Sequence, residues 1–411
     1  MSKISFIHCA DLHLDSPFRG LSHITDHMFK DIRESTFASL DALVQLAVDK
    51  KVDFVLIVGD LFDSNQQSLK AYIHLQRALE KLNKHNIFVY LSYGNHDYIN
   101  GQTFEADFPA NVHVFSSENV TTATFTKHGN VLANIYGFSY EDRAVIENKS
   151  SEFQQTGESP FHIGMLHGSI SSNTDHDIYA PFSLTDLSSS GFDYWALGHI
   201  HVREILKKEP LIVYPGNIQG RSRKESGEKG CYLVEMDEQG AELEFYPLQQ
   251  IKFETISLDV SAHKSPHHLE QCLEEELKKN NDLGRLVVTL HLGSETEFLQ
   301  AWHQSGELAE IIDLVNESFE LDHSWIYIQD YHVINEPSWE RDELVNGEHF
   351  IGELLRLVDI SNTEDIEGHI EPLVRHKQAR KFVEVLSDEE MTDIKYQAEQ
   401  LLLHQLLGKK G

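Results

Sequence analysis

The stretch that decides the fold of this chain is Ile87-Phe88-Val89-Tyr90-Leu91, followed shortly by Gly94-Asn95-His96-Asp97. The apolar run predicts a buried strand of an α/β sheet. Gly94 lets the backbone turn sharply, and an amide oxygen, an imidazole and a carboxylate come directly after it. Taken alone, these four residues are more typical of an ordinary polar turn, because turns favour such residue types. The rest of the chain has to decide between a turn and a ligand site.

Length, composition and cysteine content indicate a globular protein with more than one domain. The 411 residues exceed the size at which one core stops growing, so two or three domains are expected, and 40% hydrophobic content is ordinary. The N-terminal apolar run is too short for a signal peptide, and no run of about 18 apolar residues could span a membrane. We therefore expect a cytoplasmic protein without membrane contact. Cys9, Cys231 and Cys272 are too scattered for a disulfide framework or a thiolate zinc site.

The charge balance argues against strong unaided binding to nucleic acid. Lys and Arg number 34 against 66 Asp and Glu, which gives a formal net charge of −32. Affinity for DNA comes largely from neutralised phosphates, so this chain is expected to be a poor autonomous DNA binder. Bound metal ions would offset the acidity of an active site, but not that of a whole surface.

Residues 1–250 alternate apolar runs with amphipathic stretches, which predicts an α/β layered domain. Helices are expected at about 26–50 and 66–85, and a polar surface loop at 148–160. Strands are expected at 4–10, 53–58, 87–92, 112–115, 131–138, 161–166, 192–197, 211–214, 231–236 and 242–247.

The pattern changes near residue 250. Strands at 253–260, 285–292 and 325–334, separated by helices at 266–280 and 295–317, predict a small α+β domain over residues 251–336. Residues 337–411 are expected to be mainly helical. Their Leu-rich end, Leu401 to Leu407, would either dock a partner helix or pack on its own domain.

Four further apolar runs end in side chains of metal-ligand type, as the opening stretch does. Their ends carry Asp11 and His13, then Asp60 and Asp63 after Gly59, then His167, then His199 and His201. Each end alone fits a turn, a helix cap, a satisfied buried histidine or a surface pair. Together they point to one site, because ligands gather at the carboxyl ends of strands in α/β folds. Asp11 and His13, spaced by two, would share one side if the extended conformation continued.

The chemistry of these side chains indicates a site for two ions. The set comprises four His, two Asp and one Asn, without thiolate, which suits Mn, Fe or Zn better than Mg or Ca. Seven side chains are too many for one ion with an open position, but they suit two ions that share a carboxylate. Such a pair clamps the attacking and leaving oxygens of a phosphoryl transfer and makes hydroxide available near neutral pH.

The order Asp-x-His, Gly-Asp-x-x-Asp, Gly-Asn-His-Asp, a lone His and Gly-His-x-His resembles the calcineurin-like metallophosphoesterases over about residues 4–220. The resemblance implies a two-sheet sandwich flanked by helices. It implies a first metal held by Asp11, His13, Asp60 and His201, and a second held by Asp60, Asn95, His167 and His199. It also places His96 at the leaving group as a catalytic residue oriented by Asp97, and it makes Asp63 an orienting residue rather than a ligand.

Within that family the chain most resembles the SbcD-type DNA-repair exonucleases, and especially their YhaO-like branch. The segments that carry this likeness are Ile7 to Asp15, Gly59 to Asp63 and Tyr214 to Gly230. The resemblance implies an exonuclease domain at 1–250, a DNA-facing cap at 251–336 and a docking region at 337–411 for an SMC-like ATPase. Manganese is the favoured metal, with Fe, Zn or Mg as alternatives, and a homodimer is a further option. Pro215-Gly216-Asn217 departs from the usual Pro-Gly-Ser, and some relatives have His where Asp63 stands.

Arg221 and Arg223 belong to the basic cluster near the predicted site, and we expect them to bind substrate phosphates; the alternative is an ordinary solvated loop. Two other functions stay open. One is a metallophosphodiesterase for a small substrate such as a cyclic nucleotide or a dinucleotide, which the acidic composition favours. The other is a scaffolding subunit with a vestigial metal site, against which the complete ligand set argues.

Overall fold

The apolar runs of the first 250 residues form two six-stranded sheets in the computed structural model. It describes residues 2–18, 21, 24–63, 67–101, 104, 107–171, 179–279, 284–294, 296–320, 324–334, 341–347, 349–361, 368, 372 and 388–407. Contacts divide the chain into two compact units, Met1–Val333 and Ile334–Gly411. The predicted α+β domain thus belongs to the first unit.

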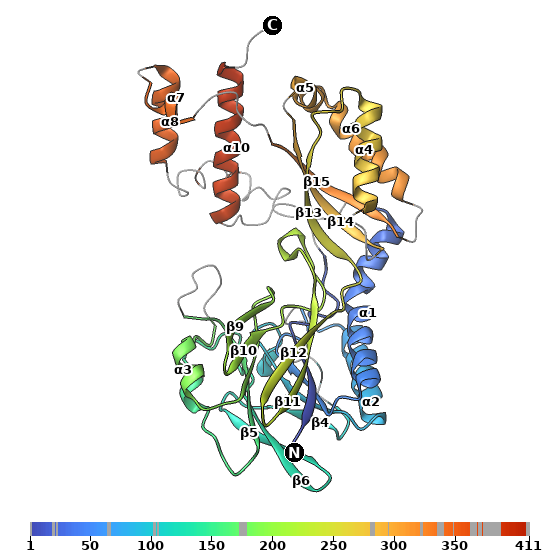
Figure 1. Ribbon diagram of the computed structural model, residues 1–411, viewed down its shortest axis with the longest axis vertical. Helices are drawn as coiled ribbons and strands as arrows, with labels where there is room; N and C mark the ends of the chain where they lie inside the picture. Colours follow the sequence, from blue (N-terminus) through green and yellow to red (C-terminus); the bar gives the residue numbers. More distant parts are fainter. Residues whose placement is uncertain are drawn as a thin grey trace. The chain divides into compact units, whose positions relative to one another are not determined.

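The first sheet has the strand order β12-β11-β1-β2-β3-β4 (Figure 1). Its strands are β1 (Ile4–Ala10), β2 (Phe54–Val58), β3 (Phe88–Ser92), β4 (Val112–Val114), β11 (Gly230–Asp237) and β12 (Gly240–Pro247). Strands β1 to β4 pair in parallel, whereas β11 is antiparallel to both β1 and β12. The carboxyl ends of β1, β2 and β3 therefore lie side by side at one edge.

The second sheet has the order β5-β6-β7-β8-β10-β9. Its strands are β5 (Thr121–Lys127), β6 (Asn130–Gly137), β7 (Phe161–His167), β8 (Tyr194–Gly198), β9 (Glu204–Lys208) and β10 (Leu211–Tyr214). The central strands β6, β7, β8 and β10 are parallel, and an antiparallel strand closes each side. This parallel core gives the second sheet a carboxyl edge of its own.

Apolar alternation explains why the two sheets form a sandwich. On β1, Phe6 and Ala10 point inward, where they join Phe54 of β2 and Met165 of β7 in one core. The alternate residues, such as Ile7, face the opposite side and pack against helices. Helices α1 (Asp26–Lys50) and α2 (Leu69–Lys84) cover the outer face of the first sheet, and α3 (Leu184–Ser189) packs on the second (Figure 1). The predicted two-sheet α/β sandwich is confirmed.

The α+β segment completes the first unit. A three-stranded sheet of β13 (Lys252–Asp259), β14 (Leu286–Gly293) and β15 (Ile326–Ile334) packs against α4 (Pro266–Lys279), α5 (Glu297–Ser305) and α6 (Glu307–Phe319). On the other side of the sheet, Trp325 joins an apolar cluster with Met28 and Ile32 near the start of α1. The Trp325 Nε1–H also donates to Asp31 Oδ2 at 3.0 Å. This cluster holds the small sheet on the two-sheet sandwich.

The second unit is helical in its described parts, with α7 (Arg341–Val345), α8 (Phe350–Ile360) and α10 (Asp388–Leu407). Arg341 donates to Glu399 of α10 at 2.7 Å and to Asp359 of α8 at 2.6 Å, so one guanidinium links the three helices. Much of the predicted helical region 337–411 lies outside the described residues. Among the described helices, none is long and apolar enough to cross a membrane.

The main differences from the sequence prediction lie at the edges of the sheets. Strands β5 and β9 and helix α3 were not predicted, because Thr121–Lys127 and Glu204–Lys208 are polar segments without a buried apolar run. The single helix expected at 295–317 is two helices, α5 and α6. They meet at Gly306, whose φ of +88° ends the first helix in the left-handed region that glycine adopts easily.

Candidate metal centre

The seven predicted ligands are brought to the carboxyl edges of both sheets. Asp11 follows β1, Asp60 follows β2 and Asn95 follows β3, while His167 ends β7 and His199 follows β8. Sheet pairing makes β1, β2 and β3 neighbours, and it makes β7 and β8 neighbours. The five strand ends that looked independent in the sequence therefore meet in one place, and the opening tetrapeptide is part of that place rather than an isolated turn.

The backbone reaches this site by left-handed turns, not by continued strands. Asp11, His13, Asp60 and His199 have φ values of 52°, 41°, 51° and 95°. The extended conformation on which the expected shared side of Asp11 and His13 depended does not continue, yet the turns bring both side chains into one donor group. Left-handed backbone costs roughly 1–2 kcal/mol at a non-glycine residue. Hydrogen bonds to the next strand offset this cost, such as His13 N–H to the Asp60 carbonyl at 3.0 Å.

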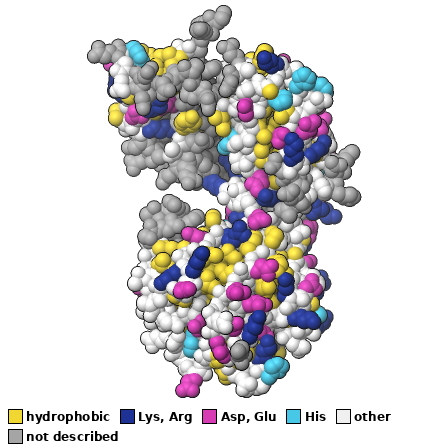
Figure 2. Space-filling view, viewed as in Figure 1, with side chains coloured by type: hydrophobic (Ala, Val, Ile, Leu, Met, Phe, Trp, Pro, Cys, Tyr) yellow, Lys and Arg dark blue, Asp and Glu magenta, His cyan; other side chains and the backbone are white. Residues whose placement is uncertain are grey.

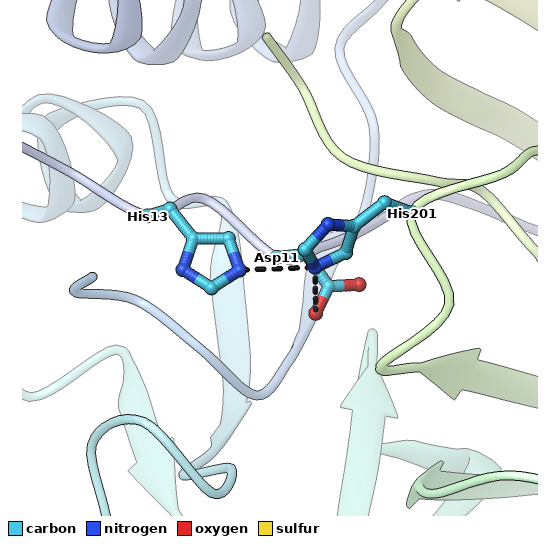
Figure 3. A group of neighbouring side chains, drawn as sticks. All are labelled: Asp11, His13 and His201. Atoms are coloured by element: carbon cyan, nitrogen blue, oxygen red, sulfur yellow. Dashed lines mark hydrogen bonds and ion pairs between the residues drawn. The ribbon is translucent and has the colours of Figure 1, made fainter. Parts of the chain in front are cut away.

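Asp11, His13 and His201 form a first group of donors (Figure 3). The His13 Nε2 and His201 Nε2 atoms are 3.1 Å apart, and His201 Nε2 is 3.8 Å from Asp11 Oδ1. Two imidazole nitrogens and a carboxylate oxygen thus face one another in a largely buried position. Such a mixed nitrogen and oxygen set suits a transition-metal ion.

A second group consists of Asp11, Asp60 and His167, all buried. Asn95 adds its amide oxygen, which lies 3.0 Å from His167 Nε2 and 3.3 Å from His199 Nδ1. Asp11 belongs to both groups, whereas the prediction gave the shared position to Asp60. Asp60 also reaches both, because its Oδ2 is 3.4 Å from His167 Nε2 and 3.8 Å from His13 Nε2.

Glycines leave the room that these side chains occupy. A Cβ at Gly59 would lie 2.2 Å from His167 Nδ1, and one at Gly94 would lie 2.3 Å from Asp60 Oδ1. Gly198 is as tightly enclosed, since its Cβ would lie 2.1 Å from the Val58 carbonyl oxygen. The glycine that precedes a ligand in three of the motifs is therefore required by close approach, not only by the turn.

Hydrogen bonds fix which nitrogen of each imidazole faces the donors. A carbonyl can only accept, so the 3.0 Å contact between His167 Nδ1 and the Val58 oxygen places the proton on Nδ1. The same reasoning applies to His201, whose Nδ1 is 2.7 Å from Glu225 Oε1. In both rings Nε2 faces the other donors, so it is the atom through which the ring would bind a ligand. A carboxylate or carbonyl behind a ligating histidine is the usual arrangement in metal sites.

The electrostatics of the cluster suit a cation. Burial, reinforced by Arg221, holds the pKa of His13 well below its usual range, so this imidazole is neutral. Burial also lowers the pKa of His167, but Asp60 and Asp11 outweigh burial and raise that pKa to about 9. Burial opposes ionisation of Asp60, yet the His167 imidazole outweighs it and holds the pKa of Asp60 well below its usual range. A proton on His167 thus balances buried carboxylate charge, and a divalent cation could replace that proton. The donors therefore fit metal ions.

His96 and Asp97 have different surroundings. The His96 side chain is partly exposed, its Nδ1–H donates to the Asp63 carbonyl at 2.8 Å, and its backbone N–H donates to Asp60 Oδ1 at 3.0 Å. Asp97 accepts the backbone N–H groups of Leu61 and Gly94, both at 2.7 Å. Asp97 thus fixes the loop, the Asp63 carbonyl orients the His96 ring, and orientation of His96 by the Asp97 side chain stays a prediction.

Asp63 and the two arginines form ion pairs at the rim. The Asp63 carboxylate lies 3.5 Å from His13 Nδ1 and is paired with Arg221, which agrees with an orienting role for Asp63. Arg221 is mostly buried and also pairs with Glu225 at 3.1 Å. Arg223 pairs with Asp330 of β15 at 2.5 Å. Both guanidinium groups have carboxylate partners, so phosphate binding by either stays a prediction.

Glu225 is a residue of the site that the sequence analysis did not single out. Its carboxylate accepts a hydrogen bond from the predicted ligand His201. The signal available was its position in Tyr214 to Gly230, the segment that carries the family likeness. Tyr140 and Tyr214 were also missed; their hydroxyls donate to the carbonyls of His167 and Gly168 at 2.8 and 2.6 Å.

Comparison with known proteins agrees with this geometry. A family model described as calcineurin-like phosphoesterase matches residues 4–203, which contain all seven predicted ligands. The chain belongs to the calcineurin-like metallophosphoesterases, a family that uses a two-metal centre.

More particularly, the chain is 40% identical to the metallophosphoesterase YhaO of Bacillus subtilis (strain 168) over 409 residues, 99% of this chain and 98% of that protein. It is 26% identical over 301 residues to the DNA double-strand break repair protein Mre11 of Thermoplasma acidophilum, covering 68% of this chain and 75% of that protein. A protein of the same name from Methanocaldococcus jannaschii is 27% identical over 260 residues, 61% of this chain and 66% of that protein.

Proposed function

We propose that this metallophosphoesterase is a DNA-repair exonuclease that uses two divalent ions, Mn²⁺ before Fe, Zn or Mg, and acts in the cytoplasm. The observation that carries the proposal is the pair of adjoining donor groups that share Asp11. Two bound ions would make hydroxide available near neutral pH and offset the charge that develops on phosphoryl oxygens. The arrangement suits hydrolysis of a phosphodiester.

His96 supplies the other half of this chemistry in our proposal. Its Nδ1–H is committed to the Asp63 carbonyl, so the Nε2 atom is the one free to exchange a proton with a leaving oxygen. It lies beside the donors, since its ring centroid is 5.0 Å from that of His13. A protonated His96 would act as general acid while the buried residues hold the ions.

DNA as the substrate is supported by the relatives named as double-strand break repair proteins. The alignment of 301 residues with the Thermoplasma protein is longer than the family match at 4–203, so it includes residues beyond the phosphoesterase motifs. We assign the α+β domain at 251–336 as the part that faces DNA. Acidic and basic side chains are interspersed on the described face in Figure 2. With a net charge of −32, this surface fits a protein that engages DNA with a partner's help.

The partner we propose is an SMC-like ATPase that docks on the region 337–411, and a homodimer is also compatible. Helix α8 exposes Phe350, Leu357 and Ile360 by 69%, 61% and 77%. On α10, Leu402 and Leu406 are exposed by 40% and 46%, whereas Leu403 is buried. The Leu-rich end thus packs on its own unit with one part and leaves another part available for a partner helix.

A comparison of two substrates tests the proposal. The purified chain, alone and co-expressed with an SMC-like ATPase from the same genome, is incubated with end-labelled single- and double-stranded DNA and Mn²⁺ or Mg²⁺. Bis-p-nitrophenyl phosphate serves as a small diester in parallel. We expect stepwise shortening of the DNA and its loss on adding a chelator. Hydrolysis of the small diester without DNA degradation in either preparation would refute the nuclease proposal.

The second candidate function is a small-molecule phosphodiesterase, and one observation favours it. The excess of 32 acidic charges opposes the approach of a long polyanion far more than that of a dinucleotide. With a cyclic nucleotide or a dinucleotide added as a further substrate, this function would give its hydrolysis with DNA left intact. A scaffolding subunit would hydrolyse none of the substrates, although its donor set is complete.

A further inference from the structure

Glu225 lies directly behind a predicted ligand of the first donor group. It ends the 3₁₀ turn Arg223–Glu225, and its Oε1 is 2.7 Å from His201 Nδ1. Arg221 Nη2 is also near this nitrogen, at 3.3 Å, but a guanidinium can only donate. A bare Nδ1 facing the carboxylate at 2.7 Å would be repelled, so Nδ1 carries the proton and donates it to Glu225. The Nε2 lone pair is then directed toward His13 and Asp11.

The carboxylate of Glu225 is held by the chain itself. Its Oε2 accepts from Asn217 Nδ2 at 2.8 Å and from the Arg221 backbone N–H at 2.7 Å. The Arg221 guanidinium donates to Oε1 at 3.1 Å. Asn217 is fully buried, so its amide is a fixed donor to the second carboxylate oxygen.

The segment that carries Glu225 is anchored on both sides. Arg223 is paired with Asp330 of the α+β domain, and the Gly227 N–H donates to the Phe253 carbonyl at 3.0 Å. Lys229 Nζ donates to the backbone carbonyl of His201 itself at 2.9 Å. The positions of His201 and Glu225 are therefore set by the fold, before any ligand arrives.

We propose that Glu225 is a positioning residue for His201: it holds the ring in the Nδ1–H tautomer, aims Nε2 at the first ion and raises the basicity of that nitrogen. The inference rests on the proposed metal-dependent function of the same site. Groups that hold a ligating histidine in this way change metal affinity by about 10–100-fold when they are removed. Glu225 acts through His201 and touches neither the ion nor the substrate.

Metal titration of matched variants tests this. Binding of Mn²⁺ to the full-length chain is followed by calorimetry and by electron paramagnetic resonance for the wild type, Glu225→Gln, Glu225→Ala and Glu228→Ala. Glu228 is a suitable control, because it lies on the same segment but is 52% exposed and pairs with Arg203 at the surface. Thermal melting without metal shows whether each variant is folded. Glu225→Gln keeps the shape of the side chain and an acceptor for Nδ1–H. It therefore still tests the inference if Glu225→Ala does not fold.

We expect Glu225→Ala to weaken one of two Mn²⁺ sites by about 10–100-fold and Glu225→Gln to weaken it less, with the other site unchanged. Glu228→Ala should bind as the wild type does. In a His201→Ala background the Glu225 substitutions should have no further effect. Folded Glu225 variants that bind both ions within twofold of the wild type would overturn the inference. Failure to degrade DNA leaves these titrations interpretable, so it refutes the proposed nuclease without touching this assignment.

Discussion

Replacing His96 by Ala should remove turnover without removing metal. The His96 backbone N–H that anchors Asp60 Oδ1 at 3.0 Å survives this substitution, because only the side chain is lost. The imidazole belongs to neither donor group. Asp60 therefore keeps its position, and the donors stay in place. What disappears is the Nε2 atom whose orientation is set by the 2.8 Å hydrogen bond from Nδ1 to the Asp63 carbonyl.

The size of the effect follows from the role assigned to that nitrogen. A positioned general acid contributes typically 100- to 10,000-fold, about 3–5 kcal/mol of transition-state stabilisation. We expect kcat on a phosphodiester with an alkoxide leaving group, such as DNA or a dinucleotide, to fall by this factor, while metal content measured by mass spectrometry stays at the wild-type level. His85→Ala is the control, because His85 is exposed at the other end of β3. Loss of an ion in His96→Ala would show that His96 is a ligand and would refute the reasoning.

Three further substitutions probe the ligand set, the enclosing glycines and the domain contact. Asp60→Ala removes the carboxylate that lies 3.4 Å from His167 Nε2 and 3.8 Å from His13 Nε2. We expect metal analysis of this variant to find neither ion bound. Two bound ions per chain would contradict a role of Asp60 in both sites. Gly59→Ala places a Cβ 2.2 Å from His167 Nδ1 at a φ of +76°, and it should lower stability by about 1–3 kcal/mol and impair metal binding. An unchanged melting temperature and unchanged metal affinity would show that the added Cβ neither destabilises the fold nor disturbs the site. Trp325→Phe removes the 3.0 Å hydrogen bond to Asp31 but keeps an apolar ring, so we expect a loss of about 1–2 kcal/mol in denaturant unfolding, and a neutral result would show the bond is dispensable.

The sequence was sufficient for most of the framework because the signal is local there. Buried parallel strands such as Val55 to Ile57 are continuous apolar runs, and this property can be read without knowing the neighbours. The edge strands β5 and β9 could not be read in this way, since most residues of each are exposed and only pairing with a neighbouring strand defines them. The break at Gly306 has a local signal, since glycine adopts the left-handed conformation that ends α5, but the prediction of a single helix at 295–317 did not use it.

The candidate donors could also be found in the sequence, because each lies close behind the end of a predicted strand and has a side chain of metal-ligand type. Asp11, Asp60, Asn95, His167 and His199 could be identified as candidates from residue type and position alone. Their convergence depended on sheet order, which places β1, β2 and β3 side by side and β7 beside β8. The sequence could suggest that convergence, through the repeated strand ends and the family resemblance, but it could not show the contacts.

Only the tertiary structure shows which groups accept hydrogen bonds from the site histidines. The partners of His201 and His96 are Glu225, 24 residues away, and the Asp63 carbonyl, 33 residues away. A carboxylate in a polar loop has the same appearance in a sequence whether it faces solvent or an imidazole. The left-handed turns at Asp11 and His13 were likewise invisible, since hydrogen bonds to the adjacent strand stabilise them. Ligand identity is a local property of the chain, whereas orientation, protonation and the choice of partner depend on contacts between distant segments.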